Sequence, residues 1–386
     1  MHCRWGRACA LLVLISWLSS CSLFSSDEEN EPAELQDFDE IVELDSLWSR
    51  RIGDQGEEEL YIRLTPAIDG DRIYAANVDG KVFAIDRRED DRLWKVDVDA
   101  QLLSAVGAGE GLVLVGSTEG ILIALKQEDG SELWRVPLSS EMLAAPQVEA
   151  GMVVVQTMDG SASGLKAATG ETVWTYNTTL PSLTLRMSGT PVLDNGTAYM
   201  AFASGKVIAL DSESGLLRWQ QTVALPKGRN ELERLINFDG KLLVTGSDVY
   251  AGSYQGSVAA VDKNQGRISW SEEASVLGAL AADKGSVYFT QSDDAVVGLK
   301  MATARRFWEN RDFARRQLTA PVVLGDFLVV GDSEGYLHVL RQSDGTVAGR
   351  EHVGGDGIRN ALLSDGETLY VLTNSGKLRA YQLAEP

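Results

Sequence analysis

One string recurs along this chain, and it constrains the fold more than any other feature. The segment DGKVFAIDRREDDRLW, from Asp79 to Trp94, contains a turn, an alternating apolar run, a charged turn and a tryptophan. Related strings follow down the sequence, and their registered second position falls at Gly80, Gly120, Gly160, Gly205, Gly256, Asp294, Gly335 and Gly376. The intervals run from 38 to 51 residues. A period of this size predicts a repeat fold.

Each unit is predicted to contain four short β-strands. Runs such as RIYAAN and KVFAID alternate in polarity and are separated by xDG turns, which is typical of hairpins rather than helices. Because every unit is alike, the pattern favours propeller blades over a sandwich. The sequence therefore predicts an all-β fold, an eight-bladed β-propeller with quinoprotein-like or WD40-like blades.

A tryptophan stands 14 residues after the registered position in six of the copies. We expect these side chains to pack between blades, since a buried indole removes about 150 to 250 Å² from water. Stacking on a ligand is the alternative. The seventh copy carries Gly349 at this position, which predicts one looser junction between blades.

The eighth copy is incomplete, because the chain ends at Pro386 before a fourth strand can form. The segment ELDSLWSR, around Trp48, carries a tryptophan of the same kind and has no blade of its own. We predict that this amino-terminal strand completes the last blade and covers its bare edge. The propeller would then comprise residues 46–386.

The amino terminus has the pattern of a secretory signal over residues 1–20. Arg4 and Arg7 precede a short apolar stretch, which is followed by LSSC ending at Cys21. This ending resembles a bacterial lipobox, which implies cleavage before Cys21 and attachment of lipid to its thiol. An ordinary signal with a chance cysteine is the alternative. The resemblance implies a periplasmic protein anchored by lipid, and Ser22 favours the outer membrane.

Residues 21–45 are predicted to be a lipidated acidic tether without a fold of its own. Ten acidic and no basic residues occur between Asp27 and Asp45. The formal net charge of the whole chain is −21, which argues against nucleic acid and anionic membrane surfaces as partners.

No catalytic or metal-binding pattern is evident in the sequence. The histidines are His2, His338 and His352, and neither CxxC nor HExxH spacing occurs. Strings of the form AxDxxxGxxxW, such as Ala209 to Trp219, resemble the repeats of eight-bladed quinoprotein dehydrogenases, whose cofactor is pyrroloquinoline quinone. Those enzymes use adjacent cysteines and calcium, and shared blades do not transfer chemistry. We therefore expect no cofactor and no enzymatic activity.

Two neighbouring connections between blades are longer than the others. Trp174 to Pro191 spans 17 residues and Trp219 to Leu242 spans 23, against 10 to 13 elsewhere. Consecutive connections of one type leave a propeller side by side, and long loops on a rigid frame often carry binding. In the first, Leu183 and Leu185 are expected to alternate as in a strand. Merely variable surface loops are the alternative.

The whole chain resembles the BamB family, lipoproteins of the outer-membrane β-barrel assembly machinery. The resemblance rests on the lipobox, the acidic tether, the blades, and the segments PSLTLR (Pro181 to Arg186) and ERLINFD (Glu233 to Asp239). It implies contact with the POTRA domains of the barrel protein BamA. The implied partner-binding residues are Leu183, Leu185, Arg186, Asn237 and Asp239, although Asn237 replaces an acidic residue of the family pattern.

These observations together predict a non-enzymatic periplasmic scaffold that aids insertion of outer-membrane proteins, with nascent barrel proteins as a second class of partner. A quinoprotein-type oxidoreductase is one alternative. A general periplasmic propeller scaffold with a different partner is another.

Overall fold

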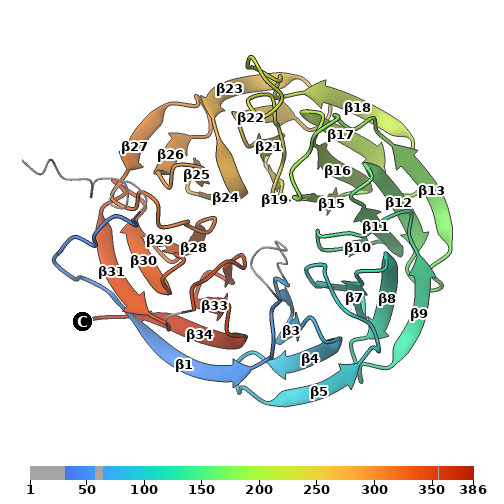
Figure 1. Cartoon of the computed structure of the whole chain (residues 1–386), viewed down its shortest axis with the longest axis horizontal. Coiled ribbons are helices and arrows are strands. Elements are labelled where there is room, and N and C mark those ends of the chain that lie inside the picture. Colours follow the sequence, from blue (N-terminus) through green and yellow to red (C-terminus); the bar gives the residue numbers. More distant parts are fainter. Residues whose placement is uncertain (1–30, 57–63, 355) are drawn as a thin grey trace, which may run out of the picture.

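The computed structural model describes residues 31–56, 64–354 and 356–386. In these ranges the chain is built from strands, and it contains no helix of the length and apolarity needed to cross a membrane. Eight four-stranded antiparallel sheets surround a central axis like the blades of a propeller (Figure 1). The predicted all-β, eight-bladed fold is confirmed.

In each blade the strands follow one another outward from the axis (Figure 1). The first four blades consist of β2 (Ala67–Asp69), β3 (Arg72–Ala76), β4 (Lys81–Asp86) and β5 (Arg92–Asp97); β6 (Gly107–Gly109), β7 (Leu112–Gly116), β8 (Ile121–Lys126) and β9 (Glu132–Pro137); β10 (Gln147–Glu149), β11 (Met152–Gln156), β12 (Ser161–Lys166) and β13 (Thr172–Asn177); and β15 (Val192–Asp194), β16 (Thr197–Phe202), β17 (Lys206–Asp211) and β18 (Leu217–Thr222).

The last four blades repeat this order, and the eighth takes its outer strand from the amino-terminal part of the chain. They consist of β20 (Leu243–Thr245), β21 (Asp248–Gly252), β22 (Gly256–Asp262) and β23 (Ile268–Ala274); β24 (Val276–Asp283), β25 (Ser286–Gln291), β26 (Val296–Lys300) and β27 (Arg306–Asn310); β28 (Val322–Leu324), β29 (Phe327–Gly331), β30 (Tyr336–Arg341) and β31 (Val347–His352); and β32 (Leu363–Ser364), β33 (Thr368–Leu372), β34 (Lys377–Ala384) and β1 (Glu43–Arg51).

The registered glycine of the repeat is required by a turn that brings two backbones close together. Gly80 has a φ of 88°, and a Cβ there would lie 2.4 Å from the carbonyl oxygen of Ala100. Asp294 holds the same position in the sixth blade with a φ of 64°. Its carboxylate accepts backbone hydrogen bonds from Gln317 and Leu318, at 3.1 and 2.7 Å, and so binds the next connection.

The interblade tryptophans pack as predicted, and each donates its indole N–H to a backbone carbonyl of the following blade. Trp94, for example, donates to Gln127 at 2.9 Å, and the turn at Gly130 lies against its ring. The complete set of donors and acceptors is Trp48 to Arg87, Trp94 to Gln127, Trp134 to Ala167, Trp174 to Ser212, Trp219 to Lys263, Trp270 to Met301, and Trp308 to Gln342. These contacts join neighbouring sheets that share no ladder.

The amino-terminal strand closes the ring, as the truncated eighth copy predicted. β1 pairs antiparallel with β34, from Glu43 opposite Ala384 to Arg51 opposite Lys377. Figure 1 shows this strand as the outermost of the eighth blade, next to the first blade. Trp48 packs with Ile73 and Phe83 of the first blade in one buried cluster. Strand β1 and the carboxy-terminal strand β34 are thus joined noncovalently.

The expected loose junction at Gly349 is wrong, because the segment before β1 fills it. A Cβ on Gly349 would lie 2.2 Å from the carbonyl oxygen of Val42, and the Val42 side chain is buried beside Ala348. Opposite the tryptophans stand alanine or glycine, but Gly349 faces Val339. Two aliphatic side chains therefore occupy the space of the missing indole.

The expected boundary between tether and propeller at residues 45/46 also differs from the structure. Strand β1 begins at Glu43, and the backbone N–H groups of Ile41 and Val42 donate to the carbonyl of Ala348 at 2.9 and 3.3 Å. Arginines on the connection between blades six and seven, and one on β31 of blade seven, bind backbone carbonyls of residues 31–42. The predicted signal peptide and Cys21 lie outside the described residues.

We predict that Trp48→Ala lowers the free energy of unfolding by about 3 to 5 kcal/mol, because it leaves a cavity where the ring closes. The matched control is Leu47→Ala, since Leu47 is the adjacent residue of β1 and is 46% exposed. Its effect should stay within about 0.5 kcal/mol. Urea unfolding of both variants measures this difference, and equal midpoints would contradict closure through Trp48.

Candidate functional site

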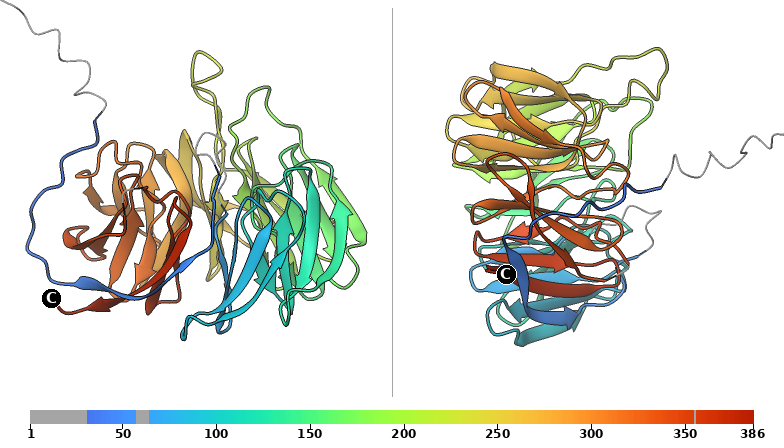
Figure 2. Two further views of the ribbon diagram at one scale, coloured as in Figure 1. Left: turned by 60° about the horizontal axis from the view of Figure 1, so that its bottom comes forward. Right: turned by 90° about the vertical axis from the view of Figure 1, so that its left-hand side faces the viewer.

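The two long connections lie side by side, as their consecutive order predicted. Residues 178–188 join the third and fourth blades, and residues 223–239 join the fourth and fifth. Each ends in a two-residue strand, β14 (Gly189–Thr190) and β19 (Gly240–Lys241), and these two strands pair in parallel. Both connections project from the same face of the propeller, which we call the long-loop face (Figure 2).

Asn237 joins the two long connections rather than facing solvent. Its side chain is 3% exposed, and its amide Nδ2 donates to the carbonyl of Leu185 at 2.9 Å. The amide oxygen accepts the N–H of Phe238 at 2.8 Å. Burial and these bonds make Asn237 a positioning residue for the two connections, and its expected direct contact with the partner stays a prediction. An acid at this position, when ionised, could not donate to Leu185.

The two leucines of the first connection do not alternate as in a strand. The N–H of Met187 donates to the carbonyl of Leu185 at 2.9 Å, which bends the chain tightly. Leu183 is 40% exposed, whereas Leu185 is half-buried and lines a small cavity with Leu180 and Phe202. Of the pair, Leu183 is therefore the more accessible to a partner.

Arg186 is exposed but already engaged within the chain. Its guanidinium binds Glu141 with both branches, at 2.7 and 3.2 Å, in the forked geometry that suits a carboxylate. The side chains are 40% and 27% exposed, so solvent screens the pair considerably. Glu141 lies on the connection between the second and third blades. Asp239, the remaining predicted residue, is half-buried directly before Gly240.

The second connection presents two exposed leucines that the sequence reasoning missed. Leu225 and Leu232 are 67% and 66% exposed. Glu233 orders the tip between them, because its carboxylate accepts the backbone N–H of Arg229 at 2.6 Å and the amide of Asn230 at 2.8 Å. The signal in the sequence that could have identified them is that these leucines stand within a strongly polar loop. With Leu183 they form what we call the loop-leucine set.

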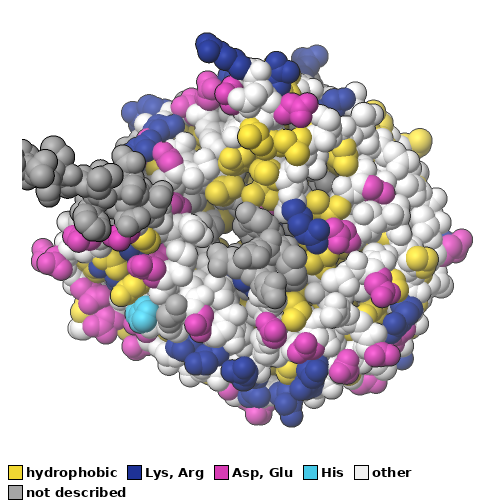
Figure 3. Space-filling model, in the orientation of Figure 1, with side chains coloured by type: hydrophobic (Ala, Val, Ile, Leu, Met, Phe, Trp, Pro, Cys, Tyr) yellow, Lys and Arg dark blue, Asp and Glu magenta, His cyan; other side chains and the backbone are white. Residues whose placement is uncertain are grey.

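Figure 3 shows this face with apolar side chains gathered beside the central opening, over the region of β19 to β22. Acidic and basic side chains are more frequent around the rim of the same view. Such an apolar region within a charged surface is typical of protein interfaces. The face is therefore suited to bind another protein.

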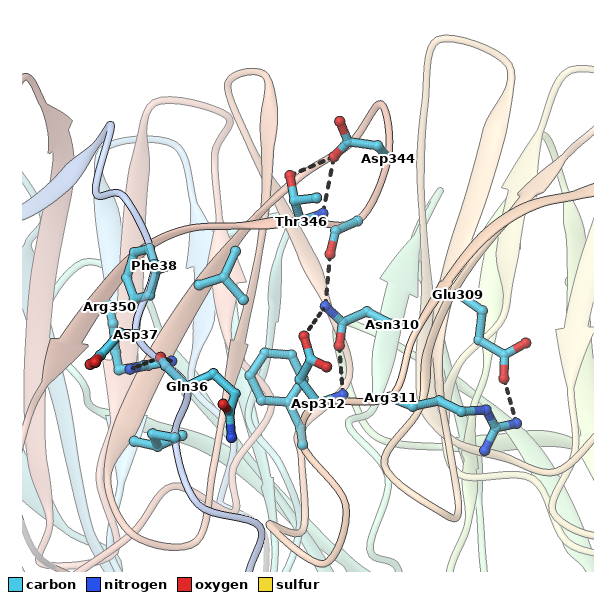
Figure 4. Close-up of a pocket in the computed structure, with 14 residues that line it drawn as sticks. Gln36, Asp37, Phe38, Glu309, Asn310, Arg311, Asp312, Asp344, Thr346 and Arg350 are labelled. Atoms are coloured by element: carbon cyan, nitrogen blue, oxygen red, sulfur yellow. Dashed lines mark hydrogen bonds and ion pairs between the residues drawn. The ribbon is translucent and has the colours of Figure 1, made fainter.

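The described ranges contain no group of three His, Cys, Asp or Glu side chains placed to hold a metal ion. The buried His338 binds Asp332, with 2.9 Å between Nε2 and Oδ2, and lies in blade seven rather than at the long loops. A cavity of about 340 Å³ lies nearby, between residues 35–38 and blades six and seven (Figure 4).

We predict that Asn237→Asp loosens the first connection, because the ionised side chain loses the donor to Leu185 and repels its carbonyl. The cost should be about 1 to 3 kcal/mol, measured as faster hydrogen exchange in residues 181–188. Lowering the pH should restore protection, since the protonated acid can donate again.

The control for this change is Asn264→Asp, which introduces the same charge at an exposed turn between β22 and β23. That turn lies on the opposite face, so exchange in residues 181–188 should not change. Equal exchange in wild type and Asn237→Asp would contradict the positioning role.

A family model described as Outer membrane protein assembly factor BamB matches residues 78–310. Among similar curated proteins, the outer membrane protein assembly factor BamB of Pseudomonas aeruginosa is 54% identical over 380 residues, covering 98% of this chain and 99% of the relative. The protein of the same name from Legionella pneumophila is 39% identical over 373 residues, covering 95% and 97%.

Solved structures give a consistent result. The crystal structure of BamB from Moraxella catarrhalis aligns with a TM-score of 0.81 at 29% identity, covering 88% of this chain and 99% of that one. The quinohemoprotein alcohol dehydrogenase of Comamonas testosteroni aligns with a TM-score of 0.69 at 14% identity, covering 88% and 76%. At that identity the dehydrogenase shares the fold alone.

Proposed function

The chain belongs to the BamB family of outer membrane protein assembly factors, and from that premise we propose that it is a non-enzymatic scaffold that binds the POTRA domains of BamA. The proposed role is to hold these domains in place while outer-membrane proteins insert. The long-loop face would make the contact.

One observation carries this proposal: a rigid ring raises the loop-leucine set on two paired connections of one face. Leu225 and Leu232 are two-thirds exposed on a connection that pairs with the one carrying Leu183, and neighbouring exposed apolar side chains are typical of surfaces that another protein covers. The β14–β19 pair and Asn237 fix the connections before binding. A partner therefore meets a preformed surface and loses little loop entropy in binding it.

Arg186 and Glu141 would add orientation to this apolar contact. Their mutual ion pair is partly exposed, so exchanging it for a pair with a partner costs little. A carboxylate or backbone carbonyl of the partner could bind the guanidinium fork in place of Glu141. Such an exchange fixes register more than it raises affinity.

An oxidoreductase function is the alternative, and a shared fold alone does not carry the chemistry over to this chain. Its support is the shared fold of a dehydrogenase at 14% identity. The binding measurement below distinguishes the proposed function from that of a general scaffold with a different partner.

We further propose that residues 1–20 are a signal peptide and that Cys21 carries lipid. The mature chain would then sit on the periplasmic face of the outer membrane. The sequence LSSC supports this assignment, and so does membership of a family of outer membrane protein assembly factors.

Each of Leu183→Ala, Leu225→Ala and Leu232→Ala should weaken binding of a soluble POTRA fragment by about 1 to 3 kcal/mol, because apolar anchors carry much of an interface energy. The matched control is Leu216→Ala, which alters a 70% exposed leucine at the turn before β18 on the opposite face. Calorimetric titration and melting temperature are recorded together. Full affinity in the triple variant would exclude this surface.

Cys21→Ala should leave the propeller folded but release it from membranes, because the thiol that carries the lipid is absent. Fractionation after a salt wash measures the change. If the variant still sediments with outer membranes, the lipid attachment is wrong.

A further inference from the structure

The segment just before β1 is bound along the outside of the propeller. We call residues 31–42 the amino-terminal strap. At its start, the N–H of Ala33 donates to the carbonyl of Ala314 at 2.9 Å, and Arg316 Nη1 donates to the carbonyl of Ala33 at 2.8 Å. Arg315 Nε donates to the carbonyl of Glu31 at 2.5 Å. These bonds involve the strap backbone, so they fix its path.

Farther along, Arg350 of β31 holds the strap. Its guanidinium donates to the carbonyl of Gln36 at 3.3 Å and lies 4.9 Å from the ring centre of Phe38 (Figure 4). The strap then reaches Ala348, which accepts the N–H groups of Ile41 and Val42. The strap is therefore bound at both ends and in the middle.

A buried network fixes Arg316 and Arg350, two of the three arginines that bind the strap. The side chain of Arg316 is 2% exposed, and its Nε donates to the fully buried carboxylate of Asp332 at 2.7 Å. His338 donates from Nε2 to the same carboxylate, and its Nδ1 accepts from Arg350 Nε at 3.3 Å. Burial lowers the pKa of His338, so the ring is neutral near pH 7 and can accept this bond.

Buried ion pairs of this kind usually add little net stability, because the charges lose their hydration. Their better-attested effect is to specify one arrangement. The cavity of about 340 Å³ lies between residues 35–38 of the strap and blades six and seven, so this part is not closely packed (Figure 4). The network is therefore suited to position the strap rather than to stabilise the blade.

The strap reverses the direction in which the chain leaves the propeller. Strand β1 runs to the long-loop face, where residues 52–66 lead to the first blade, so Glu43 starts on the opposite face. From Glu43 back to Ala33 the strap returns along the outside to the long-loop face (Figure 2). The nine residues of β1 span about 30 Å from one face of the propeller to the other, and the strap covers the same distance in the reverse direction.

We propose that the strap makes the lipid anchor hold the long-loop face toward the membrane. The inference rests on the proposed lipid at Cys21 and on the proposed partner surface. Nine residues, 22–30, separate Cys21 from the strap, and they can reach at most about 30 Å. If the strap were not bound, the 21 residues between Cys21 and Glu43 could reach about 70 Å, and they would join the propeller at the opposite face.

The test uses the full lipidated protein in vesicles of phosphatidylethanolamine and phosphatidylglycerol that contain an acceptor-labelled lipid. A donor dye is attached to a single introduced cysteine, because Cys21 is the one cysteine expected in the mature chain. The label is placed at Ser182→Cys on the long-loop face or at Glu213→Cys on the opposite face, and both positions are exposed. Energy transfer to the membrane should be greater from position 182.

The strap is released by combining Ala33→Pro, Phe38→Ala and Ile41→Pro, which remove two backbone donors and the ring beneath Arg350. The expected result is that the difference between the two labels disappears or reverses. The control is Gln36→Ala, which keeps the carbonyl that Arg350 binds and should preserve the difference. The melting temperature shows that the blades remain folded.

Equal transfer from both positions in the native protein, or an unchanged difference after strap release, overturns the role of the strap while leaving the anchor intact. If the protein fails to float with the vesicles at all, the lipid attachment falls and the inference falls with it. Binding of a soluble POTRA fragment is measured separately in solution, so loss of the partner surface is distinguished from both outcomes.

Discussion

The indole N–H that each interblade tryptophan donates to the next blade is the interaction on which the rest of this structure depends. A four-stranded blade cannot bury both of its faces alone, so its stability comes from its neighbours. The indole supplies a large apolar surface and one polar atom, and the carbonyl of the next blade satisfies that atom. Seven such contacts, together with the aliphatic side chains at the Gly349 junction, link the eight sheets into one ring.

A closed ring explains why the connections can carry the proposed binding surface. The blades hold the ends of each connection at fixed positions, and so loops may lengthen on one face without disturbing the core. Pairing of β14 with β19 and the bond from Asn237 to Leu185 then limit how the two long connections move. The exposed leucines lie on a support that is itself well ordered.

The amino-terminal part of the chain has three connected tasks. Trp48 closes the ring, Val42 fills the junction at Gly349, and the strap returns the chain to the long-loop face. The close approach of Val42 is possible because Gly349 has no Cβ. Gly349 stands where the other blades carry a tryptophan, and its lack of a side chain lets the Val42 segment approach and fill the junction.

The sequence by itself determined the number of blades, the place of each tryptophan, the closing strand and the adjacency of the two long connections. These features follow from a local period, because the residues of each repeat contain the pattern of that repeat's own strands. Only the tertiary structure decided that Asn237 is buried, that Arg186 is engaged by Glu141, and that the acidic segment before Glu43 is bound. In each case the partner lies about 45 or more residues away, and no period relates the two positions. Such contacts form only where the closed ring brings separate connections and chain ends together.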